Sequence, residues 1–160
     1  MIKLLWAMDK NNLIGKNNRL PWHINEELQH FKATTRGQTI LFGRLTYEGI
    51  GHLLLNRKTL VLTTQPDYQI NHPDVKVVTD LSAIINFYYQ KPTEDIYICG
   101  GKQIYQVTLP VADELIISYI KGNYKGDTYF PKFDLIQFTL IKTAEYQQFV
   151  IKYYKRKEQN

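Results

Sequence analysis

The chain has little cysteine, no long hydrophobic run and no repetitive segment, and each shortage excludes a class of protein. Its one cysteine, Cys99, rules out an intrachain disulfide and fits a reducing compartment. The apolar run from Leu4 to Met8 is stopped by Asp9, so it is too short for a signal peptide or a membrane span. Without repeats, low-complexity tracts or long linkers, the 160 residues are most simply one domain, 1–160. We therefore expect a single-domain cytoplasmic protein.

The rest of the composition is ordinary except for its tyrosines and its positive charge. Hydrophobic residues make up 44% of the chain and charged residues 22%, as in soluble globular proteins, and the 12 tyrosines favour a substantial sheet. The formal net charge of +5 admits three explanations: nucleic-acid binding, anionic small ligands or a solvated surface. The dense basic run from Lys152 to Lys157 is interleaved with Tyr153 and Tyr154 and alternates like a terminal strand, so we interpret it as a solvated face. The other cations are scattered, which favours local anion sites.

Strand-like and helix-like segments alternate first and then give way to consecutive strands. Strands are predicted at 2–8, 39–42, 58–63, 75–78 and 95–99, helices at 26–34, 44–50, 81–90 and 102–109, and final strands at 114–121, 136–143 and 148–156. Asn25 and Asp80 are predicted N-caps. Residues 9–24 form a long loop of the kind that usually has a function. The pattern predicts an α/β fold: a mostly parallel, twisted eight-stranded sheet with an antiparallel C-terminal strand, flanked by about four helices.

The helix over 26–34 carries an acid on an apolar face. Glu27 and Phe31 lie one turn apart on the same face, with Leu28 beside them. If Glu27 is buried, desolvation raises its pKa and suits it to holding or moving a proton near neutral pH. The alternative is that Glu26 and Glu27 only complement the positive end of the helix dipole.

Three strand ends carry residues suited to an anion. Gly43-Arg44 follows one strand and opens a helix, Gly100-Gly101 does the same later without a cation, and Thr63-Thr64 ends a third strand with hydroxyls. Because ligands of open α/β sheets bind beyond the carboxyl ends of the strands, these segments could share a pyrophosphate, and hence a dinucleotide. Neither glycine site, Gly43-Arg44 or Gly100-Gly101, belongs to a GxGxxG motif or a P-loop, so plain turns are the alternative.

The remaining candidates narrow the chemistry. Arg57 follows an apolar run and could bind a carboxylate through two hydrogen bonds at the entrance of an apolar cleft, or it could be a surface arginine in a turn. The four histidines lack metal-ligand spacing, so we expect no metal. We interpret Cys99 as a small hydrophobe rather than a nucleophile, and no serine sits in a nucleophile elbow. The set favours hydride transfer coupled to proton transfer over hydrolysis.

Short motifs follow one another along the chain in a specific order. They are Ile14-Gly15, Leu20-Pro21-Trp22, Glu27-Leu28 with Phe31-Lys32, Gly43-Arg44-Leu45-Thr46-Tyr47-Glu48, Ile50-Gly51, Asn56-Arg57-Lys58, Gly100-Gly101 with Ile104-Tyr105, and Gly126-Asp127-Thr128 with Phe130-Pro131. In this order and spacing they resemble the dihydrofolate reductases of the short single-domain bacterial type, over essentially the whole chain. The resemblance implies NADPH-dependent reduction of 7,8-dihydrofolate to tetrahydrofolate, with hydride to C6 and a proton to N5, in one-carbon and thymidylate metabolism.

The resemblance also implies which residues handle the substrate. Glu27 stands at the family's carboxylate position, where it would hydrogen-bond the pterin 2-amino group and N3 and favour the protonated N5; Trp22 and Ser118 join it as catalytic residues. Apolar side chains would line the site of the substrate's aminobenzoyl group, and Arg57 would bind the α-carboxylate of its glutamate. The implied substrate-binding residues are Leu5, Ala7, Leu28, Phe31, Lys32, Ile50, His52, Leu54, Arg57 and Cys99.

The cofactor implied by the resemblance is NADPH. Arg44, Thr63 and Thr64, with Gln65, match the positions that favour the 2′-phosphate, and the loop of residues 9–24 matches the family's mobile lid, which Gly126-Asp127 would help to hold closed. The implied cofactor-binding residues are Ala7, Ile14, Gly15, Asn18, Leu20, Gly43, Arg44, Leu45, Thr46, Thr63, Thr64, Gln65, Cys99, Gly100, Gly101, Lys102, Gln103, Ile104 and Tyr105.

The chain departs from the family's commoner residues at several places. They are Glu27 for Asp, Ser118 for Thr, Gly49 for Ser, His52 for Arg, Leu55-Asn56 for Pro-Gly, and a bulky Trp6 beside Ala7. Asn tolerates a left-handed turn, so Asn56 can replace glycine there. None of these changes removes a group that the reaction requires.

The partners implied are dihydrofolate and antifolate inhibitors, and we expect a monomer that binds neither nucleic acid nor a membrane. Two alternatives remain open from the sequence. A reductase of the same fold could act on another heterocycle, such as a pyrimidinedione of flavin synthesis, and would not need Glu27 and Arg57 together. A non-catalytic binding module, for example one for nucleic acid, would use neither residue and would bind DNA with a steep salt dependence.

Overall fold

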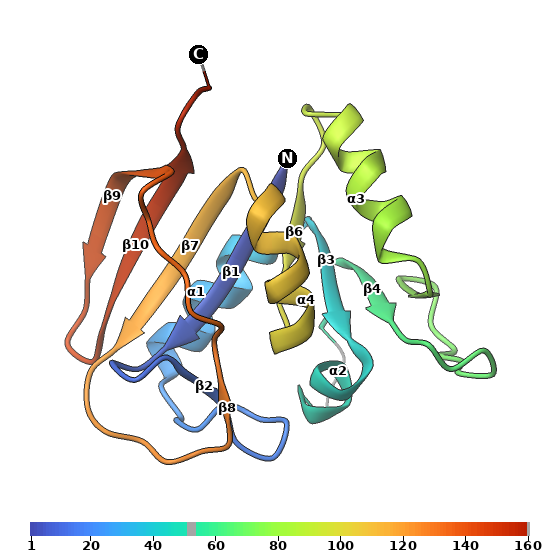
Figure 1. Cartoon of the computed structure of the whole chain (residues 1–160). Helices are drawn as coiled ribbons and strands as arrows, with labels where there is room; N and C mark the ends of the chain where they lie inside the picture. Colours follow the sequence, from blue (N-terminus) through green and yellow to red (C-terminus); the bar gives the residue numbers. More distant parts are fainter. Residues whose placement is uncertain (51–53, 160) are drawn as a thin grey trace.

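The structure, a computed structural model, describes residues 1–50 and 54–159 and is built on an eight-stranded sheet (Figure 1). In spatial order the strands are Val75–Val78 (β5), Lys58–Leu62 (β4), Thr39–Gly43 (β3), Ile96–Ile98 (β6), Ile2–Met8 (β1), Glu114–Ile120 (β7), Phe149–Arg156 (β10) and Phe138–Glu145 (β9). Leu13–Gly15 (β2) and Thr128–Tyr129 (β8) form a separate two-stranded sheet. The helices are Asn25–Thr35 (α1), Arg44–Ile50 (α2), Leu81–Gln90 (α3) and Lys102–Thr108 (α4), the last continued by a 3₁₀ turn, Leu109–Val111.

The strand directions confirm the predicted fold class. The strands from β5 across to β7 pair in parallel, whereas β10 runs antiparallel to both β7 and β9. Parallel strands end at the same edge of a sheet. The segments that follow β1, β3, β4 and β6 therefore gather there, which is where an open α/β sheet binds its ligands.

Alternating side chains on β1 divide the core into two layers. Leu4 and Trp6 point into one layer with residues of α3 and α4, whereas Leu5 and Ala7 point into the other with residues of α1 and α2. In Figure 1, α1 lies behind the sheet and α4 in front of it. Because both faces are covered, β1 can be an almost unbroken apolar strand.

This alternation explains how the bulky Trp6 is accommodated beside Ala7. The Trp6 ring stacks on Phe130 with a centroid distance of 4.0 Å and an interplanar angle of 5°, and it lies 5.7 Å from the ring of Tyr105. Trp6 therefore fills the layer of α4, and the face that carries Ala7 stays free of its bulk.

The helix starts test the two predicted caps. Asp80 caps α3 as predicted, because its side chain accepts a hydrogen bond of 3.1 Å from the Ala83 N–H. The prediction for Asn25 is wrong: the N-cap of α1 is Ile24, which makes no side-chain cap bond, and Asn25 is already helical. Ile24 is buried in the apolar layer and its carbonyl accepts the Leu28 N–H, so packing sets the start of this helix.

The segment predicted as a plain loop, 9–24, contains the short strand β2, which pairs with β8 far along the chain. A strand of three residues is too short to show a period, which explains why the pattern missed it. Asn12, Asn17 and Asn18 take positive φ angles of 64°, 52° and 62°, as does Asn56 at 63°. The expectation that Asn56 replaces a glycine in a left-handed turn is therefore confirmed.

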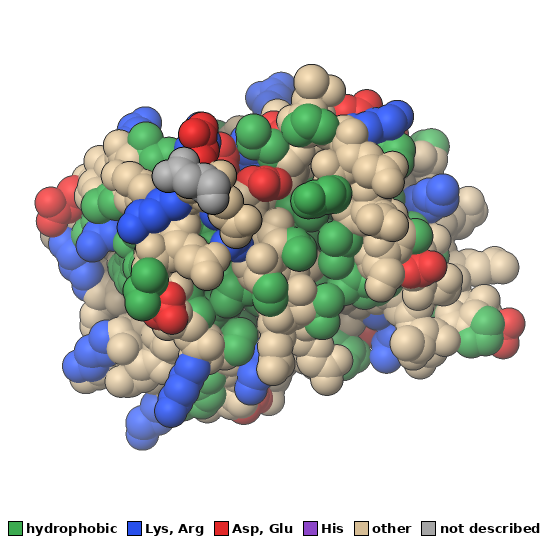
Figure 2. Space-filling view, turned by 45° about the horizontal axis from the view of Figure 1, so that its top comes forward, with side chains coloured by type: hydrophobic (Ala, Val, Ile, Leu, Met, Phe, Trp, Pro, Cys, Tyr) green, Lys and Arg blue, Asp and Glu red, His purple; other side chains and the backbone are tan. Residues whose placement is uncertain are grey.

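The surface fits the interpretation of scattered charge. On the face drawn in Figure 2, blue lysine and arginine side chains lie in separate places among red acidic ones and form no continuous stripe. Within the described residues, no helix combines the length and the apolar character that a membrane crossing requires.

Candidate active site

Glu27 is a buried acid in the apolar layer between α1 and the sheet. Only 7% of the residue is exposed. Desolvation raises the pKa of its carboxyl, and the Ser118 hydroxyl opposes this with a smaller lowering effect. The prediction that Glu27 is a functional acid, and does not only complement the helix dipole, requires that the side chain be buried. The structure shows this burial.

Ser118 and Trp22, predicted with Glu27 as catalytic residues, are both buried in its neighbourhood. Ser118 lies on β7, next to Ala7 of β1 in the parallel register. Its hydroxyl is close enough to the Glu27 carboxyl to lower the pKa of that group by hydrogen bonding. The buried Trp22 indole N–H makes no hydrogen bond with a described residue, so it can donate to a ligand.

Tyr105 belongs to the other layer of the core and bonds the backbone of β1 next to the site. Its hydroxyl donates a 2.8 Å hydrogen bond to the Leu5 carbonyl, and the ring is almost fully buried. Burial raises its pKa strongly, and the nearby Cys99 and Glu27 raise it further, so these groups lie within electrostatic reach of one another. Cys99 itself is buried with a raised pKa, as expected of a small hydrophobe.

The apolar walls predicted for the substrate come together in one layer. Leu5, Ala7 and Cys99 are buried members of it, and Phe31, Ile50 and Leu54 pack against them. Leu28 is half-buried on α1. His52, which was also predicted to contribute, lies outside the described residues.

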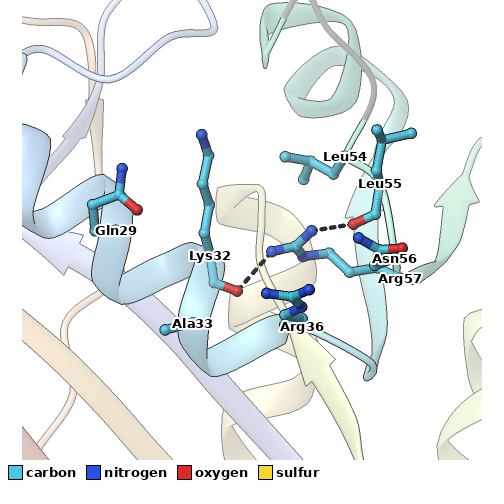
Figure 3. A pocket seen from close by; sticks show the side chains of 8 residues that line it. All are labelled: Gln29, Lys32, Ala33, Arg36, Leu54, Leu55, Asn56 and Arg57. Carbon is cyan, nitrogen blue, oxygen red and sulfur yellow. Dashed lines mark hydrogen bonds between the residues drawn. The ribbon is translucent and has the colours of Figure 1, made fainter.

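Arg57 lies at the mouth of this layer, in a cavity of about 450 Å³ (Figure 3). Its Nε donates to the Thr35 hydroxyl at 2.7 Å, one terminal nitrogen donates to the Lys32 carbonyl at 2.6 Å, and the other donates to the Leu55 carbonyl. The residue is only 9% exposed. A guanidinium has five N–H groups, so this arrangement fixes its orientation and leaves two for a ligand. The alternative of a loose surface arginine is thereby excluded.

The two glycine sites, Gly43-Arg44 and Gly100-Gly101, meet at the carboxyl edge of the sheet. The Gly43 N–H donates to the Gly100 carbonyl at 2.8 Å. A Cβ on Gly101 would lie 2.8 Å from the Thr46 hydroxyl, and one on Gly43 would lie 3.2 Å from Ile104. A side chain at either position would crowd these neighbours, and glycine leaves the backbone open to a phosphate-bearing ligand. The prediction that the two sites share one crevice is supported by this contact.

Arg44 and Thr63 are among the charged and hydroxyl groups predicted to bind a phosphate. Arg44 pairs with Glu48 at 3.1 Å, one turn along α2, and lies over the ring of Tyr68. The Thr63 hydroxyl is buried and accepts a hydrogen bond from the Gln65 N–H. Arg44 thus has an internal partner that the sequence interpretation did not consider.

Other predicted cofactor residues lie at the surface. Leu20 and Leu45 are 51% and 52% exposed. Ile104 is buried, and Ile14 and Gly15 belong to β2. The solvent-exposed members of the predicted set are Asn18, Leu20, Leu45, Thr64, Gln65, Lys102 and Gln103.

The loop of residues 9–24, the predicted lid, is hydrogen-bonded to Asp127 in the segment that was predicted to hold it. The Asn17 N–H donates to the Asp127 carboxylate at 3.0 Å, and the Asp127 N–H donates to the Gly15 carbonyl at 3.0 Å. A Cβ on Gly126 would come within 2.4 Å of the same carbonyl. These contacts support the predicted role of Gly126-Asp127 in holding the loop.

The sequence interpretation missed three residues that hold parts of the site in place. Asp9, at the base of the lid, is buried and accepts the N–H groups of Asn11 and Leu13; an Asp followed by polar loop residues is a turn signal that could have shown it. Thr35 supports Arg57 from 22 positions away, and no local pattern signals that. Glu48 pairs with Arg44 at the i,i+4 spacing, which could have been recognised.

The described residues contain no group of three or more His, Cys, Asp or Glu side chains arranged to hold a metal ion. The set consists instead of one buried acid, one oriented guanidinium, an apolar wall and a glycine-lined crevice.

Known proteins with this arrangement are dihydrofolate reductases. The family model for dihydrofolate reductase matches residues 1–157. A dihydrofolate reductase of Mycoplasma genitalium is 41% identical over 161 residues, covering 99% of this chain and all of the relative. One of Bacillus subtilis is 38% identical, covering 91% of this chain and 84% of the relative.

A solved structure agrees with these sequences. Dihydrofolate reductase from Enterococcus faecalis, complexed with NADP(H) and RAB-propyl, superposes with a TM-score of 0.87 at 32% identity, covering 99% of this chain and 97% of the other. A match over the whole length at this identity extends beyond the fold. The chain belongs to the dihydrofolate reductase family.

Proposed function

We propose that this protein performs the family's reaction, the NADPH-dependent reduction of 7,8-dihydrofolate to tetrahydrofolate, in the crevice between α1 and the carboxyl edge of the sheet. The observation that carries the proposal is the burial of Glu27 in an apolar layer that ends at the oriented Arg57. A pterin needs an acid at one end of its site and its glutamate tail needs a cation at the other. A reductase for a tail-free heterocycle would need neither in this combination.

Glu27 binds the pterin and governs its proton. Burial raises the pKa of its carboxyl, and this carboxyl hydrogen-bonds the 2-amino group and N3 of the pterin. An acid held at this site favours the protonated form of N5, which makes C6 a better hydride acceptor. When bound, NADPH supplies that hydride.

The surrounding residues position the ring and exclude water. Tyr105 bonds the Leu5 carbonyl of β1 next to the site, and the small side chain of Ala7 leaves a flat face for the rings. Trp22 lies at the end of the lid and packs edge-on against Tyr124. Excluding water strengthens the electrostatic effect of Glu27 and protects the hydride step.

The outer parts of the site bind the charged groups of the two ligands, the glutamate of the substrate and the phosphates of the cofactor. Arg57 holds the α-carboxylate of the glutamate with its two remaining N–H groups. Gly43, Gly100 and Gly101 accept the pyrophosphate by close backbone approach. A Cβ on Gly101 would lie 2.8 Å from the Thr46 hydroxyl, so a side chain there would crowd the crevice. Arg44 and Thr63 meet the 2′-phosphate, which favours NADPH over NADH.

We further propose that residues 1–160 act as one monomeric domain in the cytoplasm, where the single buried thiol of Cys99 stays reduced. Loss of NADPH absorbance on adding dihydrofolate to the purified protein tests the function directly. Turnover with NADPH and dihydrofolate, and much slower turnover with NADH, is the expected result. No oxidation of NADPH by dihydrofolate, in a folded protein, would overturn the proposal.

A further inference from the structure

The cavity around Arg57 contains a second guanidinium. Arg36 follows α1 as its C-cap residue and lines the same cavity, where Figure 3 draws it beside Arg57. The two are electrostatically coupled: desolvation, together with the positive charge of Arg36, lowers the pKa of Arg57. Lys32, on the last turn of α1, also lines the cavity.

These cations have no acidic partner among the described residues. The salt bridges of the structure involve Lys3, Arg44, Lys121 and the N-terminus, and none involves Lys32, Arg36 or Arg57. The other residues lining the cavity are the uncharged Gln29, Ala33, Leu54, Leu55 and Asn56. Like charges held together in a partly enclosed site repel, and a bound anion relieves that repulsion.

The end of α1 does not account for Arg36. A cation after a helix can hydrogen-bond the last carbonyls, but here other groups bind three of the carbonyls near this helix end. The Lys32 carbonyl accepts from Arg57, the Phe31 carbonyl from the Thr35 hydroxyl, and the Thr35 carbonyl from the Gln38 N–H. The Arg36 guanidinium is exposed and makes no hydrogen bond with a described residue, so it is available at the outer rim of the cavity.

We propose that Arg36 is a specificity residue that binds a second carboxylate of the substrate's tail, so that the protein prefers dihydrofolate carrying several γ-linked glutamates over the monoglutamate. This rests on the proposed function, because it requires the first glutamate to be held by Arg57. Each γ-linked unit adds one α-carboxylate to the tail. A chain leaving the Arg57 site toward solvent passes the rim, where Arg36 meets the added charge.

Steady-state kinetics with dihydrofolate monoglutamate and triglutamate tests this at low ionic strength. We expect kcat/KM for the triglutamate to exceed that for the monoglutamate about three- to fivefold, the contribution of one solvent-exposed ion pair. Arg36→Gln should bring this ratio close to one through a higher KM for the triglutamate. Arg36→Lys should keep most of the preference, and added salt should weaken it in the wild type.

Lys76→Gln is the matched control, because it removes the same charge from an exposed position on β5, outside the cavity. It should leave the ratio as in the wild type. A wild-type ratio of one, or a ratio that Arg36→Gln does not change, would overturn the assignment of Arg36 alone. Absence of turnover with both tail lengths in the wild type would instead contradict the proposed reaction.

Discussion

Thr35 offers a precise test of how the Arg57 clamp is built. Its side chain is fully buried, accepts the Arg57 Nε–H at 2.7 Å and donates to the Phe31 carbonyl at 2.8 Å. Thr35→Val keeps the shape but removes the acceptor, which leaves a buried guanidinium N–H without a partner. Such a loss costs about 1–3 kcal/mol.

The cost should divide between stability and substrate binding. If the guanidinium stays in place, the free energy of unfolding falls by this amount and the melting temperature drops by about 3 °C per kcal/mol. If it turns to find water, the carboxylate loses its oriented partner and the KM for dihydrofolate rises, by about tenfold for 1.4 kcal/mol. We expect both effects, with the KM for NADPH unchanged because Arg57 lies outside the glycine crevice.

Steady-state kinetics and thermal unfolding of the same samples measure the two effects. Thr35→Ser, which restores the hydroxyl, is the matched control and should recover the KM for dihydrofolate. A Thr35→Val protein with a lower melting temperature but a wild-type KM for dihydrofolate would refute the view that Thr35 positions the clamp. An increase confined to the KM for NADPH would refute the placement of Arg57 in the substrate site.

Two further changes test the cofactor side. Glu48→Gln frees Arg44 from its surface ion pair and should lower the KM for NADPH about two- to fivefold, with little effect on the KM for dihydrofolate; an unchanged or higher KM for NADPH would contradict competition between Glu48 and the phosphate. Gly49→Ala places a Cβ at 1.8 Å from the Asn18 carbonyl oxygen, so the lid must shift, and kcat/KM should fall about tenfold; full activity would show that this contact does not set the lid.

The features that local periodicity encodes were predictable from the sequence. The 3.6-residue spacing placed Glu27 and Phe31 on one helical face, and the alternation of strands and helices predicted which sheet edge would carry the glycine sites. The Asp80 cap was equally local. These predictions needed only residues within a few positions of one another.

The features that depend on distant contacts were not predictable in this way. The burial of Ile24 makes it the N-cap in place of Asn25, which becomes the first helical residue, because tertiary packing outweighed the capping preference of a single polar residue. The support of Arg57 by Thr35 and the approach of Gly49 to Asn18 join separate loops, so no spacing within one segment reveals them.

The pH dependence of Glu27 and its amide replacement is the most direct test of the account. Because desolvation raises the pKa of Glu27, the protonated form is favoured below that pKa and lost as the pH rises through it. Wild-type kcat/KM should therefore fall with rising pH, and Glu27→Gln should lose orders of magnitude in turnover at neutral pH, with partial rescue in acid. A folded Glu27→Gln protein that turns over dihydrofolate at near-wild-type rate at neutral pH would contradict the central role of this acid.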